Sequence, residues 1–242
     1  MKNQFKFLLL TLLFCSPTFA QHFDVEFGYE GGTIIFENDT PGIDAAGIFE
    51  SEFEVFNGDG TQVAEDPGFA SNFTKGDEAF SVASGDSIFV NVNQSATLGG
   101  FLNYYNPISG AFESTDASFT IEDNSPALTF DLTITENALS GDLSQFVTTS
   151  TGAEIDSHVD FILSSGAADG VYGLLLNIES DNLSGELTSN TSEAFWVLFN
   201  NGLSEEVFEN AVGNFEATAV PEPTACIFAP VALVALLKRR RV

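Results

Sequence analysis

Alternation of apolar and polar residues recurs along most of the chain and predicts β-strands. In segment 23–27, Phe23, Val25 and Phe27 fall on one face, and the acidic residues between them fall on the other. Segment 49–56 repeats this alternation. Further runs with the composition of strands lie at 87–92, 117–121, 128–134, 155–163, 171–178 and 194–199.

Turn-forming residues separate these runs. Clusters of Asn, Gly, Asp, Ser and Pro lie at 57–60, 66–68, 106–107 and 124–126. Many short strands joined by turns predict an all-β fold, either a β-sandwich or a jelly roll. One short helix is expected over 204–212, where Ser204 can cap the first turn. Glu205 and Glu206 in that turn complement the helix dipole.

The first twenty residues have the composition of a secretory signal peptide. Lys2 and Lys6 supply its basic start, and an apolar run follows at 7–14. Because small residues precede the expected junction, signal peptidase should cleave between Ala20 and Gln21. The protein is therefore expected to be exported.

The end of the chain combines a proline-bounded acidic residue, a short apolar run at 224–237 and a basic terminus. The flanking residues are Pro221, Glu222, Pro223, Lys238, Arg239, Arg240 and Arg241. The prolines keep their segment extended and accessible, while the cations hold the far end in the cytoplasm. As a helix, the fourteen apolar residues rise only about 21 Å, against a bilayer core of about 30 Å, so this transmembrane helix is a weak anchor.

In the order and position of these elements, the tail resembles the PEP-CTERM sorting signal. The resemblance implies a protein held briefly in the inner membrane, processed near Glu222 by an exosortase-type enzyme, and released to the cell surface or extracellular polysaccharide matrix. The expected organisation is a signal peptide at 1–20, an acidic β-sandwich domain at 21–218 and a sorting and anchor segment at 219–242. Division of the central part near residue 115 is the alternative.

Charge is distributed very unevenly along the chain. Of 35 Asp and Glu residues, only Glu222 lies outside 21–220, and of seven Lys and Arg residues only Lys75 lies inside it. This part therefore has a net charge of about −33, which excludes nucleic-acid binding and leaves the tail as the membrane contact. Such repulsion predicts stabilisation by salt or by bound Ca²⁺, the candidate cofactor.

Two predicted strands have polar faces that include histidine. The alternating polar residues are His22, Asp24, Glu26, Asp156, His158 and Asp160. If the two strands were neighbours, His22, Asp156, His158 and Asp160 would be candidate ligands for Zn²⁺ or Cu²⁺. The alternative is an exposed polar face on each strand.

A second candidate ion site lies near the glycine-rich turn at 57–60. Asp59, Glu65 and Asp66 offer oxygen ligands for an irregular Ca²⁺ site. The turn is not an EF-hand loop, because Gly68 stands where the bidentate Glu would be required. A plain turn without an ion is the alternative.

The function favoured by these observations is non-enzymatic. The two cysteines, Cys15 and Cys226, lie in the terminal segments, and the sequence contains neither a nucleophile elbow nor a phosphate-binding loop.

The main alternative is a carbohydrate-binding module that retains matrix polysaccharide. Tyr104 and Tyr105 would form its exposed sugar platform, whereas Trp196 is expected in the core. An enzyme acting on polysaccharide is a further alternative.

Overall fold

A computed structural model describes residues 24–36, 47–56, 61–71, 73–75, 78–123, 131–141 and 155–219. The expected signal peptide lies outside this part of the chain, as does the tail from residue 220 onward. The elements are β1 (Asp24–Glu30), β2 (Thr33–Phe36), β3 (Ile48–Glu52), β4 (Glu54–Phe56), β5 (Thr61–Ala64), β6 (Gly68–Ser71), β7 (Phe73–Lys75), β8 (Glu78–Phe80), β9 (Ile88–Asn93), β10 (Leu102–Asn106), β11 (Ala111–Glu113), β12 (Phe119–Asp123), β13 (Asp131–Ile134), β14 (Leu139–Gly141), β15 (Asp156–Ser157), β16 (Val159–Leu163), β17 (Gly170–Ser180), β18 (Phe195–Asn201) and α1 (Glu205–Ala219).

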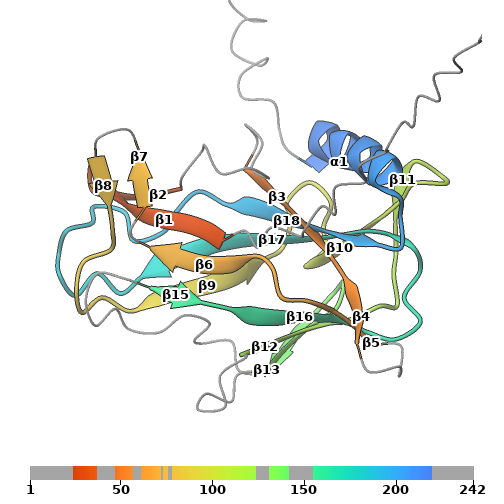
Figure 1. Cartoon of the computed structure of the whole chain (residues 1–242), viewed down its shortest axis with the longest axis horizontal. Helices are drawn as coiled ribbons and strands as arrows, with labels where there is room; N and C mark the ends of the chain where they lie inside the picture. Colours follow the sequence, from red (N-terminus) through yellow and green to blue (C-terminus); the bar gives the residue numbers. More distant parts are fainter. Residues whose placement is uncertain are drawn as a thin grey trace, which may run out of the picture.

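Three sheets contain nearly all of these strands (Figure 1). Sheet A has the order β15-β6-β1-β2, and sheet C has the order β14-β13-β12-β16-β5-β4. Sheet B has the order β11-β10-β17-β18-β3, with β9 also paired to β17. The strands β7 and β8 form a separate pair. The expected all-β sandwich is confirmed.

The core lies between the inner face of sheet B and the other two sheets. Phe195 on β18 packs against Phe36 of sheet A, with ring centroids 4.9 Å apart. Phe199, further along β18, lies 5.0 Å from Phe119 and 4.9 Å from Phe161, both in sheet C. One continuous apolar core therefore joins the three sheets, and it contains residues from both sides of position 115.

The outer face of sheet B is also apolar, because α1 covers it (Figure 1). Trp196 and Leu198 on β18 point to this side, opposite Phe195 and Phe199, and the Trp196 ring lies 4.8 Å from that of Phe215 on α1. A strand covered on both faces needs apolar residues at successive positions. This explains why β18 does not show the usual alternation, and it confirms the expected core position of Trp196.

The helix is longer than the sequence pattern indicated. It begins at Glu205, as expected, with the Ser204 carbonyl accepting from the amide of Phe208. It continues to Ala219 instead of ending near residue 212, because Phe215 and Ala219 add two further buried positions on the same face. Packing on sheet B therefore extends the helix past Gly213, a residue of low helix propensity.

Two glycines on opposite sides of this contact are expected to respond oppositely to substitution. A Cβ at Gly173 of β17 would lie 2.5 Å from Cζ of Phe215, so Gly173→Ala should lower the free energy of unfolding by about 1–3 kcal/mol. A Cβ at Gly213 would meet nothing within 4 Å, so Gly213→Ala should raise it by about 0.5–1 kcal/mol. Urea unfolding of both variants measures this, and shifts of the same sign would contradict the described packing of α1.

Candidate metal centre

A cluster of polar side chains lies on the outer face of sheet A, where β1, β6 and β15 run side by side. Asp24 of β1 pairs with Gly68 of β6, and Asp156 of β15 pairs with Ala70. If the antiparallel pairing of β15 with β6 is extended beyond Ser157, His158 lies opposite Gly68. The opposite face of the same strands holds Val25, Phe27 and Phe69, all fully buried in the core. The alternation of these strands therefore directs the acidic and imidazole side chains outward.

Gly68 determines how closely these side chains approach. It lies in the middle strand, between the strand of Asp24 and the segment of His158. The Asp24 carboxylate lies too close to the position of a Cβ on residue 68 for a side chain to fit there, and Nδ1 of His158 lies 2.9 Å from that position. Side chains two strands apart would otherwise be separated by about 9.6 Å of sheet. The missing side chain thus lets the carboxylate and the imidazole lean toward each other.

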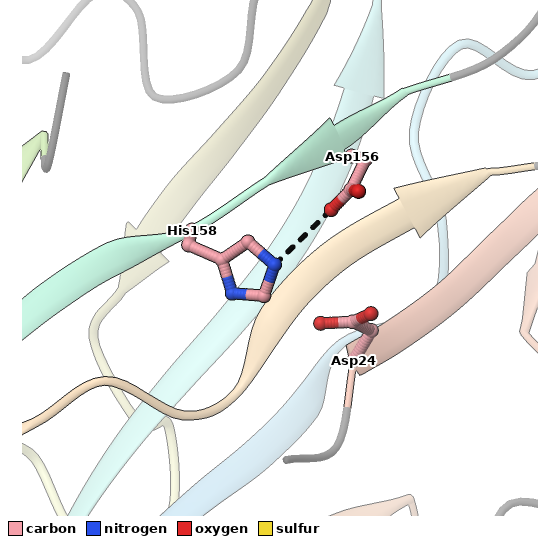
Figure 2. Close-up of side chains that lie close together, drawn as sticks. All are labelled: Asp24, Asp156 and His158. Atoms are coloured by element: carbon pink, nitrogen blue, oxygen red, sulfur yellow. Dashed lines mark ion pairs between the residues drawn. The ribbon is translucent and has the colours of Figure 1, made fainter.

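The resulting group consists of Asp24, Asp156 and His158, and one potential ligand atom from each lies within 4.8 Å of the others. Figure 2 shows both carboxylates on the same side of the imidazole, with the dashed line joining His158 to Asp156. Nε2 of His158 lies 3.1 Å from Oδ1 of Asp156, with side-chain exposures of 45 % and 71 %, respectively. Asp24 is half-buried. This is the one group of three or more such ligands that the described residues bring this close together.

The expected single strand at 155–163 is instead two strands that belong to different sheets. β15 pairs with β6 in sheet A, whereas β16 pairs with β12 and β5 in sheet C, and His158 lies between β15 and β16. Asp160 lies in β16, where it pairs with Glu122 of the neighbouring strand β12, and it is not part of the cluster. The expectation that Asp160 joins this ligand set is therefore wrong, because the chain has already passed into the other sheet.

The remaining predicted ion ligands are not brought into this group. His22 and Asp59 lie outside the described residues. Glu65 is exposed and Asp66 half-buried in the connection between β5 and β6. Asp66 uses its backbone carbonyl to accept a hydrogen bond of 2.7 Å from the hydroxyl of Ser51. The Ca²⁺ site proposed on Asp59, Glu65 and Asp66 stays a prediction.

The expected sugar platform at Tyr104 and Tyr105 is wrong for these side chains, because both are buried. Tyr104 is 7 % exposed on the core side of sheet B, where its hydroxyl donates to the carbonyl of Asp169 at 2.9 Å. Tyr105 is 4 % exposed on the other face, packed against Phe112. Two adjacent residues of a strand point to opposite faces, and in β10 both faces are covered.

A buried carboxylate elsewhere in the sandwich has its hydrogen bonds satisfied. Asp86 is fully buried and accepts from the Tyr29 hydroxyl at 2.9 Å and from the amide and hydroxyl of Ser184 at 2.7 and 2.9 Å. Burial, together with the neighbouring Asp86 carboxylate, raises the pKa of Tyr29 well above its usual range, so the phenol stays a neutral donor. This arrangement ties β1 to the loop after β17, which is a structural role.

No family model, curated protein or solved structure matches the chain. Among the residues that the structure describes, no helix has the length and hydropathy needed to cross a bilayer. The cluster on sheet A must therefore be interpreted from its own geometry.

Sequence patterns indicated part of this cluster and missed part of it. The pattern indicates Asp156 and His158 because they alternate with Ile155 and Val159, which are buried. It places Asp24 on a polar strand face but does not indicate it as a ligand. The sequence pattern places Gly68 in a turn and at the position where an EF-hand would need Glu, and no sequence signal indicates that it lies between the ligands.

Proposed function

We propose that the protein is an exported, non-enzymatic component of the cell surface or extracellular polysaccharide matrix, sorted through a C-terminal tail that is later processed. The distribution of charge is the observation that supports this most directly. Six of the seven cations lie in the two terminal segments, where they resist translocation, and the intervening part is almost free of them. The order of proline-bounded Glu222, apolar run and basic end adds the expected processing signal.

The acidic surface of the sandwich supports a role outside the membrane. Exposed carboxylates lie on sheet A at Glu30, on sheet C at Glu122, on sheet B at Glu179 and on α1 at Glu205. Negative charge on every layer keeps such a protein soluble and separate from anionic lipid surfaces. It also provides many weak sites for bridging cations, which suits a hydrated matrix.

The test is to express the full chain in a host that makes the exosortase-type enzyme, with and without replacement of Glu222 and Pro223. The original chain should lose its tail and be recovered outside the inner membrane, whereas the Glu222→Gln/Pro223→Ala variant should keep its tail and remain membrane-bound. Mass spectrometry of the C-terminus and cell fractionation measure both properties. A Pro107→Ala/Glu113→Gln variant, which makes the same chemical changes in the β10–β11 region, should be processed normally.

That experiment tests sorting, and two further assays of the processed protein with isolated polysaccharide separate the proposal from its alternatives. An uncleaved tail in both the original chain and the Glu222→Gln/Pro223→Ala variant would contradict sorting through the PEP-CTERM-like signal. Retention of the processed protein by isolated matrix polysaccharide would favour the carbohydrate-binding alternative. Release of sugars from that polysaccharide would favour the enzyme.

A further inference from the structure

We propose that Asp24, Asp156 and His158 form a binding site for a divalent transition-metal ion, with Zn²⁺ as the best-fitting ion. The three side chains come from β1, from β15 and from the residue that follows β15. The proposal depends on the folded sandwich alone. It is therefore independent of whether the tail is a sorting signal.

The spacing of the cluster matches a metal coordination sphere. Ligand atoms that each lie about 2.1 Å from a tetrahedral Zn²⁺ are about 3.4 Å from one another. Nε2 of His158 and Oδ1 of Asp156 are 3.1 Å apart, and the set that includes Asp24 spans no more than 4.8 Å. Asp156 and His158 are well exposed, so their side chains have room to turn toward a shared ion.

The middle strand holds the space for this site open. Gly68 and Ala70, the two residues of β6 that face outward here, have small side chains or none. Larger residues at these positions would cover the space between β1 and β15. The Asp24 carboxylate in particular occupies the volume that any Cβ at Gly68 would need. The arrangement of ligands therefore depends on a residue that is not itself a ligand.

The ligand types favour a transition metal over Ca²⁺. Imidazole suits Zn²⁺, Cu²⁺ and Ni²⁺, whereas Ca²⁺ takes six to eight oxygen ligands in most proteins. One imidazole and two carboxylates would bind Zn²⁺ with no net charge left over, and three protein ligands leave one position for water. Glu26, which pairs with Ala70 on the same face, adds further negative potential.

Local charge also favours a bound cation. Asp24, Glu26 and Asp156 place carboxylates around one imidazole, and Lys75 is the only Lys or Arg between residues 21 and 220. Like charges at this separation repel one another, and a divalent ion relieves that repulsion.

Calorimetric titration of the full chain, purified in mild detergent, with ZnCl₂ tests the proposal. Millimolar CaCl₂ is present throughout, so that Ca²⁺ occupies the many exposed carboxylates that bind any divalent ion weakly. One Zn²⁺ per chain should bind under these conditions. His158→Ala and Asp24→Asn should each weaken this binding by more than about tenfold, because each removes one ligand.

The variant Gly68→Ala gives the sharpest test, because it removes no ligand and the β6 backbone accepts alanine. It should weaken Zn²⁺ binding as much as His158→Ala does. The matched control is Asp160→Asn, which removes a carboxylate two residues from His158 but outside the cluster, and it should bind Zn²⁺ like the original chain. Thermal unfolding without metal checks that each variant is folded, and Zn²⁺ should raise the unfolding temperature only where the site is intact.

Three results would overturn the proposal. One is the absence of calcium-resistant Zn²⁺ binding in the original chain. The others are unchanged Zn²⁺ affinity in a folded His158→Ala variant or in a folded Gly68→Ala variant, either of which would place the bound ion elsewhere. None of these results bears on processing of the tail, so failure here and failure of the proposed sorting are distinguishable.

Discussion

Replacement of Phe199 by alanine is expected to lower the free energy of unfolding by about 3–5 kcal/mol. Phe199 is fully buried on β18, in the centre of the sandwich. Its ring centroid lies 5.0 Å from that of Phe119 and 4.9 Å from that of Phe161 in sheet C, and 5.3 Å from that of Phe53. Truncation therefore removes buried apolar surface and leaves a cavity where two sheets meet.

Urea unfolding, followed by circular dichroism, measures the change in midpoint at a constant slope. Ile108→Ala is the matched control, because it also truncates a large apolar side chain, but one that is 95 % exposed in the connection between β10 and β11. Its effect should stay within about 0.5 kcal/mol. A loss below about 1 kcal/mol for Phe199→Ala would contradict the packing of sheet B against sheet C.

Asp86→Ala is expected to lower the free energy of unfolding by about 3 kcal/mol, although it removes one negative charge from a strongly acidic chain. Asp86 is fully buried, and its two oxygens accept hydrogen bonds from Tyr29 and from the backbone and side chain of Ser184. Without the carboxylate the half-buried Tyr29 hydroxyl and the Ser184 amide and hydroxyl lose their acceptor, and hydrogen bonds to a charged group contribute about 1.5–3 kcal/mol each. Asp86→Asn keeps one acceptor oxygen and should fall between the original chain and Asp86→Ala.

Glu186→Ala, at an exposed position in the same loop, is the matched control for the change in charge. It should leave the stability within about 0.5 kcal/mol of the original value or raise it slightly, because it reduces repulsion. Chemical unfolding of the three variants at low and high NaCl separates the loss of hydrogen bonds from the change in charge repulsion, because salt screens only the repulsion. If Asp86→Ala were as stable as Glu186→Ala, the hydrogen-bonded network around Asp86 would have no structural role.

The fold class was predictable because the signals for it are local. Alternation placed β1, β9 and β17 within a few residues of their observed bounds, and the first turn of α1 was recognised from Ser204 and its acidic neighbours. The end of α1 was not predictable from local signals, because Phe215 and Ala219 extend the helix only where sheet B covers them. Strands as short as β11 and β14, at three residues each, lack enough positions for a pattern to be counted.

Burial in β10 shows the limit of such patterns more clearly. Tyr104 and Tyr105 are adjacent, so any half-exposed strand would have left one of them in solvent. Both are buried, because sheet C and sheet A cover one face of sheet B and α1 covers the other. Nothing within a few residues of the tyrosines indicates that α1 covers the second face of sheet B.

The sequence by itself determined the period of the strands, the separation of charge between the ends and the centre, and the polar character of the segment around His158. These depend on side-chain chemistry at neighbouring positions. Only the tertiary structure decided that β6 lies between β1 and β15, which brings Asp24 to His158 across Gly68. The order of strands in sheet A depends on pairings such as Asp24 with Gly68 and Ala70 with Asp156, which lie far apart along the chain, and no local pattern encodes those contacts.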